Sequence, residues 1–191
     1  PAHGKLGADP GRTTMLMSAK GGLLLLVDLQ ERLMPAISGG EAVVANAVRL
    51  AEGAGLLGVP VAATEQYPEG LGPTVRELTA YPQLVLPKTA FGAVGEPGFA
   101  MLLPPGTKEI VVAGAEAHVC VLQTVIGLRE EGHRVVVVAD AVGSRVPANR
   151  DAALTRAREH GAEVVTTEMV LFEWMAASTH PQFRDVQKLI R

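Results

Sequence analysis

Short apolar runs recur along the chain from residue 21 onward, separated by longer segments with helical character. The runs are Leu23–Asp28, Pro60–Thr64, Leu84–Pro87, Glu109–Ala113, Arg134–Ala139 and Glu163–Thr166. Several of them are continuously apolar rather than alternating with polar residues, which is typical of strands that are buried on both faces. The pattern therefore predicts six strands inside a covered sheet.

The segments between these runs are rich in Ala, Leu and Arg, and three of them stop at a glycine. Glu41–Leu57, Val119–Glu131 and Asn149–His160 are followed by Gly58, Gly132 and Gly161, as expected of helices that a left-handed residue closes. The last segment, Glu168–Arg191, is predicted to form one helix, a break at His180–Pro181 and a short terminal helix.

Strands that alternate with helices predict an α/β fold in which helices cover both faces of a parallel sheet, a Rossmann-like three-layer sandwich. Right-handed crossovers then place the loops after the strands at one edge of the sheet, where such folds bind ligands. The length of 191 residues fits one domain, which we expect over residues 21–191. We expect a flexible tail over residues 1–20, because Pro1–Gly22 holds five glycines, two prolines and little apolar periodicity.

Composition narrows the class of protein. The single cysteine excludes an internal disulfide framework and a cysteine-cluster zinc site, and it fits a reducing compartment. A net charge of −3 argues against a nucleic-acid-binding surface, which is normally basic. The longest apolar run, Leu23–Val27, is far shorter than the roughly 20 residues of a membrane-spanning helix. We expect a soluble cytoplasmic protein that binds neither nucleic acid nor membrane.

One glycine motif resembles a cofactor site. Gly53, Gly55 and Gly58 have the spacing of a dinucleotide-binding loop, but such a loop follows a strand and opens a helix. Here a helix precedes the motif and a strand follows it, so the carbonyl end of the helix would face the phosphate and repel it. We therefore expect no nucleotide cofactor. The histidines show none of the spacings that hold a metal ion, so we expect no metal site.

Three residues of different chemistry stand at the ends of predicted strands. Asp28 ends the first strand, Lys88 follows the third, and Cys120 lies in the first turn of the helix after the fourth. A helix N-terminus and a nearby cation lower the pKa of a thiol, and a carboxylate can take up its proton. The residues alone do not decide whether these three form a catalytic site. Cys120 could equally be a buried apolar residue, Asp28 a turn residue and Lys88 a solvated charge. His118 is a weaker candidate base, since residues two apart on a helix point in nearly opposite directions.

The same segments resemble the isochorismatase-like cysteine hydrolase superfamily. The resemblance rests on Leu24–Gln30, Pro87–Phe91, Gly114–Thr124 and Val138–Arg145, in the order that the family has them. It implies a six-stranded parallel sheet of order 3-2-1-4-5-6, with Cys120 as nucleophile, Asp28 as general base and Lys88 as the cation that lowers the pKa of the thiol. It also implies a cis peptide bond between Ala115 and Glu116, with the backbone N–H groups of Glu116 and Cys120 as an oxyanion hole.

The resemblance is closest to a metal-free branch of that superfamily, whose members are commonly oligomeric. The Asp-x-His metal motif of nicotinamidase-type members is missing from Thr64–Gly72, so nicotinamide is a doubtful substrate. We expect a small-molecule substrate, no metal and a homo-oligomer. The residues expected to line the substrate pocket are Gln30, Gln66, Tyr67, Phe91 and His118.

The sequence is compatible with three functions. The first is hydrolysis of an amide C–N bond through a thioester on Cys120, with Asp28 moving the proton. The second is vinyl-ether cleavage of the isochorismatase type, in which Asp28 protonates the substrate and the cysteine need not act. The third is a weakly active binding or scaffold protein, in which Cys120 is only a buried or redox-sensitive thiol.

Overall fold

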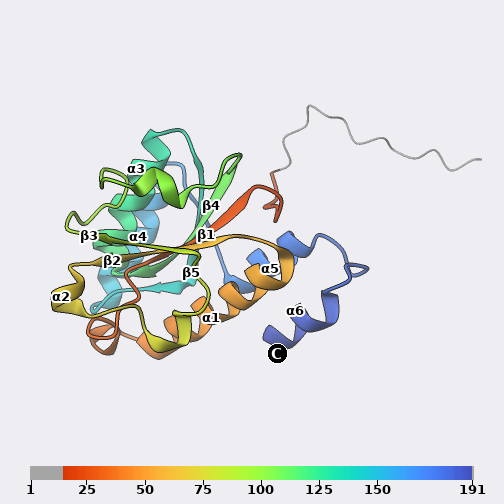
Figure 1. The fold of residues 1–191 in the computed structure, drawn as a ribbon, viewed down its shortest axis with the longest axis horizontal. Helices are drawn as coiled ribbons and strands as arrows, with labels where there is room; N and C mark the ends of the chain where they lie inside the picture. Colours follow the sequence, from red (N-terminus) through yellow and green to blue (C-terminus); the bar gives the residue numbers. More distant parts are fainter. Residues whose placement is uncertain (1–14, 191) are drawn as a thin grey trace, which may run out of the picture.

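The computed structural model describes residues 15–190, which form one sheet with helices on both of its faces (Figure 1). The six strands are β1 (Gly22–Val27), β2 (Val61–Gln66), β3 (Leu84–Lys88), β4 (Glu109–Ala115), β5 (Arg134–Gly143) and β6 (Glu163–Val165). They lie in the order β3-β2-β1-β4-β5-β6, and all neighbouring strands are parallel. The predicted sheet and its strand order are confirmed.

In the described part of the chain, six α-helices connect and cover these strands. They are α1 (Gly40–Leu57), α2 (Pro68–Leu71), α3 (Leu122–Glu130), α4 (Pro147–Glu159), α5 (Thr167–Met175) and α6 (Phe183–Leu189). A π-helical turn, Ala117–Val121, directly precedes α3, and three short 3₁₀ turns lie in the loops. Gly58 closes α1 in the left-handed conformation that the sequence predicts.

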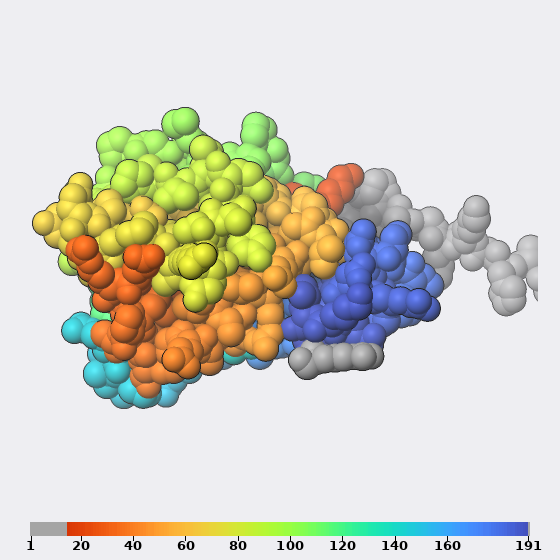
Figure 2. Space-filling view, turned by 60° about the horizontal axis from the view of Figure 1, so that its bottom comes forward, coloured from red at the N-terminus to blue at the C-terminus, as the bar shows by residue number. Residues whose placement is uncertain are grey.

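Helices on the two faces form two separate cores. Alternate residues of β1 point to opposite sides, so that Leu24 and Leu26 join one core while Leu23 and Leu25 join the other. The first core packs the sheet against α1, α5 and α6, and the second packs it against α3 and α4. Figure 2 shows the C-terminal helices beside the surface of α1. The strands read as continuous apolar runs because both of their faces are covered.

The C-terminal segment differs from its predicted boundaries. The first of its helices, α5, ends at Met175 rather than at the predicted break at His180–Pro181. Ala176 has a positive φ of 63°, with ψ −30°, and donates its N–H to the Phe172 carbonyl, which closes the helix. A residue other than glycine in that conformation carries no sequence signal, so the periodicity alone places the end too late.

The predicted tail of residues 1–20 lies mostly outside the described residues. Of the part that is described, Met17 is buried, and its N–H donates to the Glu173 carboxylate at 2.7 Å. The Ser18 N–H donates to Glu109 at 2.9 Å. Within residues 15–190, no helix is both long and apolar enough to cross a membrane.

Gly114 allows β1 and β4 to approach each other at the sheet edge that carries the candidate chemistry. It pairs with Val27, the residue before Asp28, and has φ 149°. A Cβ atom on Gly114 would lie 2.1 Å from the Val27 carbonyl oxygen, and backbone cannot yield as a flexible side chain can. This close contact sets the separation between the strand that ends at Asp28 and the strand that leads to Cys120.

The Gly114→Ala variant is expected to lose about 3–5 kcal/mol of unfolding free energy, because the added Cβ must push two central strands apart. Urea unfolding measures this loss. Gly55→Ala is the matched control, since Gly55 lies inside α1 with no atom within 4 Å of an added Cβ. Helix propensity predicts that this control gains up to about 1 kcal/mol. Equal stability of the two variants would contradict the close contact.

Candidate active site

The ends of three strands bring Asp28, Lys88 and Cys120 into one buried cluster. Asp28 follows β1, Lys88 is the last residue of β3, and Cys120 lies in the turn after β4. Since β2 lies between β1 and β3, the long lysine side chain crosses the end of β2 to reach Asp28. Lys88 Nζ and Asp28 Oδ2 are 2.7 Å apart, and both side chains are 0% exposed.

Two further contacts fix the Asp28 carboxylate. Its backbone is left-handed, with φ 52°, which is uncommon for a residue other than glycine and is tolerated best by Asp and Asn. The Thr64 hydroxyl donates to Asp28 Oδ1 at 2.6 Å. Sequence reasoning missed Thr64 as a site residue, although the predicted pairing of the first two strands could have pointed to it, because Thr64 pairs with Val27.

Lys88 has more acceptors than it has protons. In addition to Asp28, its Nζ lies 2.8 Å from Gln66 Oε1, 3.1 Å from the Ala90 carbonyl and 2.9 Å from the Phe91 carbonyl. An ammonium group has three donors, so these four oxygens fully occupy it. Lys88 therefore fixes both the Asp28 carboxylate and the backbone of the loop that follows β3.

Cys120 is a buried thiol beside a neutralised ion pair. Cys120 is 6% exposed, and its thiol lies close enough to Asp28 and Lys88 for both charges to act on its pKa. Burial raises the pKa of the Cys120 thiol to about 12; Asp28 adds to the rise, and Lys88 opposes it. Lys88 acts in the predicted direction, but burial and Asp28 outweigh it, so the pKa of the thiol is raised instead of showing the expected net lowering. The resting thiol is therefore protonated, with a carboxylate beside it to accept the proton.

The peptide bond between Ala115 and Glu116 is cis, and it lies directly ahead of the π-helical turn. The carbonyl of Glu116 accepts from the N–H groups of Val119 and Val121, so this turn starts at Glu116. The oxyanion role of the Glu116 and Cys120 N–H groups stays a prediction.

The side chain of Glu116, whose role the sequence leaves open, binds Arg145. Its Oε2 accepts the Arg145 backbone N–H at 2.9 Å, and both carboxylate oxygens lie 3.1 Å from Arg145 Nε. Burial acts to raise the pKa of Glu116, but the hydrogen bonds and charge of Arg145 outweigh it and lower that pKa below its ordinary value. Glu116 is therefore ionised. It holds the segment after β5 against the π-helical turn Ala117–Val121, which contains Cys120 and is called the cysteine turn below.

The ring of His118 contacts Ser144, which follows β5, and Asn149 of α4. Its Nδ1 lies 3.0 Å from the Ser144 hydroxyl, and its Nε2 lies 3.4 Å from Asn149 Nδ2. Both ring nitrogens therefore contact side chains outside the Asp28–Lys88 pair, and His118 stays the weaker candidate base.

Of the other four residues predicted to line the pocket, Gln30 and Gln66 are buried, whereas Tyr67 and Phe91 are exposed. Gln30 is fully buried and supports loops: its amide donates to the Gln66 and Gly72 carbonyls and accepts the Gln66 N–H. This differs from the predicted pocket role, because the backbone uses its whole amide. Gln66 contacts Lys88 directly, whereas Tyr67 and Phe91 are exposed at the surface near the cluster. Phe91 lines a surface hollow of about 480 Å³ with residues of α3.

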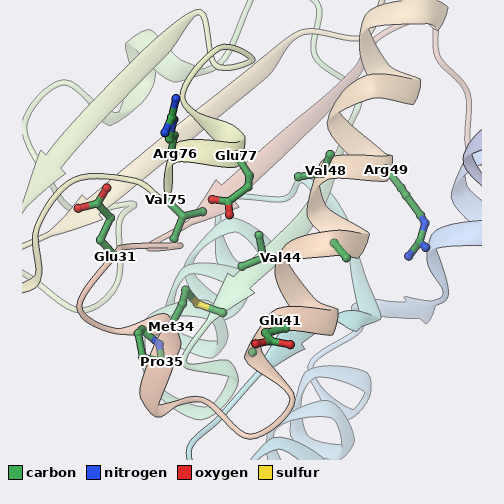
Figure 3. A pocket seen from close by; sticks show the side chains of 12 residues that line it. Glu31, Met34, Pro35, Glu41, Val44, Val48, Arg49, Val75, Arg76 and Glu77 are labelled. Atoms are coloured by element: carbon green, nitrogen blue, oxygen red, sulfur yellow. The ribbon is translucent and has the colours of Figure 1, made fainter.

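A second hollow, of about 700 Å³, lies away from this chemistry, between α1 and the loops that contain Met34 and Val75 (Figure 3). Figure 3 shows an apolar floor that includes Val44 and Val48, with charged side chains at the rim. Asp28, Lys88 and Cys120 are not among its lining residues. Its size alone therefore gives no reason to place the reaction there.

Comparison with known proteins shows which family the chain belongs to. The isochorismatase domain model matches residues 22–169, which include Asp28, Lys88 and Cys120. The chain belongs to the isochorismatase family. It is 41% identical over 175 residues to isochorismatase domain-containing protein 2 of Danio rerio, which covers 91% of this chain and 89% of the relative. It is also 41% identical over 166 residues to domain-containing protein 1 of the same species, covering 86% of this chain and 59% of that longer relative.

Solved structures place the fold in the same family. The structure titled MAR1 ribonuclease from Caenorhabditis elegans superposes with a TM-score of 0.86 and 35% identity, covering 92% of each chain. The chain therefore has an isochorismatase-family hydrolase fold. Within residues 15–190, no group of three or more His, Cys, Asp or Glu side chains is placed to hold a metal ion.

Proposed function

We propose that this protein hydrolyses an amide C–N bond of a small molecule through a thioester on Cys120. The observation that carries the proposal is the fully buried Asp28–Lys88 pair beside the Cys120 thiol, whose pKa both charged groups shift. A nucleophile, a base within hydrogen-bond reach and a third group that orients the base are the parts that covalent catalysis needs. In this site Lys88 orients Asp28, and Thr64 supports it from the other side.

The first half of the reaction forms the acyl-enzyme. The Cys120 sulfur attacks the substrate carbonyl carbon while Asp28 takes the thiol proton, and the carbonyl oxygen becomes an oxyanion. The N–H groups of Glu116 and Cys120 would stabilise that oxyanion. The C–N bond then breaks, Asp28 returns the proton to the leaving amine, and a thioester remains. A raised thiol pKa fits this sequence, because the proton leaves as the S–C bond forms.

The second half regenerates the thiol. Water attacks the thioester carbonyl while Asp28 takes one of its protons, and the C–S bond breaks. The acyl group leaves as a carboxylic acid, and Asp28 gives its proton back to the sulfur. Lys88 stays charged throughout, so it stabilises Asp28 whenever that carboxylate is ionised. Atoms and protons balance, since the net reaction adds one water across the C–N bond.

Vinyl-ether cleavage is the second candidate, and the raised pKa of Cys120 is the observation that favours it. A protonated thiol is not needed as a nucleophile in that reaction, in which Asp28 in its acid form would protonate the substrate. The same raised pKa would suit a weakly active binding or scaffold protein. Amide hydrolysis is preferred because the thiol lies against its own proton acceptor.

The name of the Caenorhabditis elegans structure raises RNA as a further substrate class. The net charge of −3 argues against it, since proteins that bind the phosphate backbone use basic surfaces. A short RNA therefore belongs in the substrate panel, where its cleavage would contradict the small-molecule proposal.

The proposal is tested by intact-protein mass spectrometry during turnover of a panel of small amides and vinyl ethers. A thioester adds the mass of the acyl group to the protein, and peptide mapping should place that mass on Cys120. Vinyl-ether turnover without any adduct would favour the second candidate. No turnover of any compound would favour the binding or scaffold function.

We also propose that the chain assembles into homo-oligomers. Leu84 and Val85 of the edge strand β3 are exposed, as is Met101. An edge strand with exposed apolar side chains is a surface that proteins usually cover. Sedimentation velocity on the full chain measures the assembly, and a monomer would contradict it. The cytoplasmic location stays a prediction from the single cysteine.

A further inference from the structure

Arg145 belongs to the strand end next to the proposed nucleophile. β4 and β5 are neighbours, and Ala115 pairs with Gly143 at their carboxyl ends. Two residues beyond this pair, the chain begins the cysteine turn on the β4 side and reaches Arg145 on the β5 side. The Glu116–Arg145 hydrogen bonds tie these two segments together.

Glu116 holds only one side of the Arg145 guanidinium. The buried carboxylate contacts Nε, and no hydrogen bond to either Nη atom occurs within residues 15–190. The Arg145 side chain is 62% exposed. A guanidinium carries five N–H donors, and its two Nη atoms form a planar fork that matches a carboxylate. Because Glu116 already fixes the side chain, binding an anion would cost little further rotamer entropy.

The buried cation of the site is not available for that task. The four oxygens around Lys88 Nζ, including Asp28 and Gln66, fully occupy its donors. An anionic group beside it would also meet the Asp28 carboxylate. The interior of the site therefore suits the neutral amide, whereas Arg145, at the neighbouring strand end, is an exposed cation that a negative charge on the substrate could reach.

We propose that the Nη fork of Arg145 binds a carboxylate of the substrate, so that the preferred substrates are short amides carrying a carboxylate a few bonds from the scissile carbonyl. This inference rests on the proposed function, which places the scissile carbonyl at Cys120. Arg145 is then a specificity-determining residue, and Glu116 is the positioning residue that aims it.

The test compares succinamate with succinamide, which share a carbon skeleton and differ in one carboxylate against one amide. Titration calorimetry on the full chain carrying Cys120→Ala measures binding without turnover. We expect succinamate to bind at least about tenfold more tightly than succinamide. Adding Arg145→Gln should remove that preference and leave succinamide binding unchanged. Arg145→Lys, which keeps the charge but loses the planar fork, should fall between. Arg156→Gln, an exposed arginine of α4, is the matched control and should change neither affinity.

Equal binding of the two compounds, equal loss of both in Arg145→Gln, or binding of neither at about 10 mM would overturn the inference. Equal loss would mean that Arg145 only holds the cysteine turn in place. In the enzyme with Cys120, Arg145→Gln should raise KM for succinamate about tenfold and leave kcat unchanged. The acyl adduct on Cys120 separates the two proposals, since it can persist with no Arg145-dependent preference, in which case only the inference fails. Urea unfolding of each variant checks that it is folded.

Discussion

Replacing Cys120 with alanine is expected to lower amide turnover at least about a thousandfold and to remove the acyl adduct, because no other group in the site can form the thioester. The fold should survive the change. Cys120 is small, it lies against the second core, and its loss leaves the Asp28–Lys88 pair intact. Removing one buried sulfur should cost about 1–2 kcal/mol of unfolding free energy. Steady-state kinetics and urea unfolding on the same preparation measure both quantities.

Cys120→Ser serves as the companion variant, since it keeps a hydroxyl in hydrogen-bond reach of Asp28. We expect it to be nearly as inactive, because Asp28 is a weak base for an alcohol, whose pKa lies far above that of a thiol. Normal turnover by the alanine variant would eliminate the thioester mechanism. Full vinyl-ether activity in the alanine variant would instead assign the chemistry to Asp28 alone.

Replacing Lys88 with methionine is expected to remove activity and about 3–5 kcal/mol of unfolding free energy. The substitution keeps most of the side-chain volume but leaves the Asp28 carboxylate in a fully buried position with no cation. It also leaves the Ala90 and Phe91 carbonyls without their donor. The urea midpoint at unchanged m-value reports the loss.

The double variant Asp28→Asn with Lys88→Met separates charge burial from packing. Removing both charges should recover a large part of the lost stability, since the unpaired charge is the main cost, while activity stays absent. Lys20→Met, at an exposed lysine, is the surface control and should change stability by less than about 0.5 kcal/mol. A stability of Lys88→Met within that same range would show that water reaches Asp28 and that the pair is not buried.

The sequence predicts a large part of the fold, because strands that are buried on both faces appear in it as uninterrupted apolar runs. The residues of β1 are apolar without interruption, since odd and even positions face separate cores. The same logic located the candidate catalytic residues, because strand ends of a parallel sheet meet at one edge. The sequence pattern did not predict the end of α5. That helix ends at Ala176, whose positive φ is uncommon for alanine and has no signal in the sequence.

The site shows the same division between local and long-range causes. Strand-end position and the family motifs together name Asp28, Lys88 and Cys120 as candidates, whereas their electrostatics could not be predicted from the sequence. The pKa of a thiol depends on how much water its neighbours exclude and on how far a nearby cation is already paired. Those neighbours come from distant parts of the chain, and Lys88 is shared with Asp28, Gln66 and two loop carbonyls. Thr64 and the second role of Glu116 were missed for the same reason.

The sequence by itself therefore determined the strand and helix types, the sheet order implied by the family motifs, and which residues are the catalytic candidates. Those properties follow from periodicity and from the order of motifs along the chain, both of which are local. Only the tertiary structure decided that the Cys120 thiol is protonated at rest, that Gln30 supports loops, and that Glu116 holds Arg145 with its Nη fork exposed. Each of these depends on desolvation and on side-chain contacts between segments that only folding brings together.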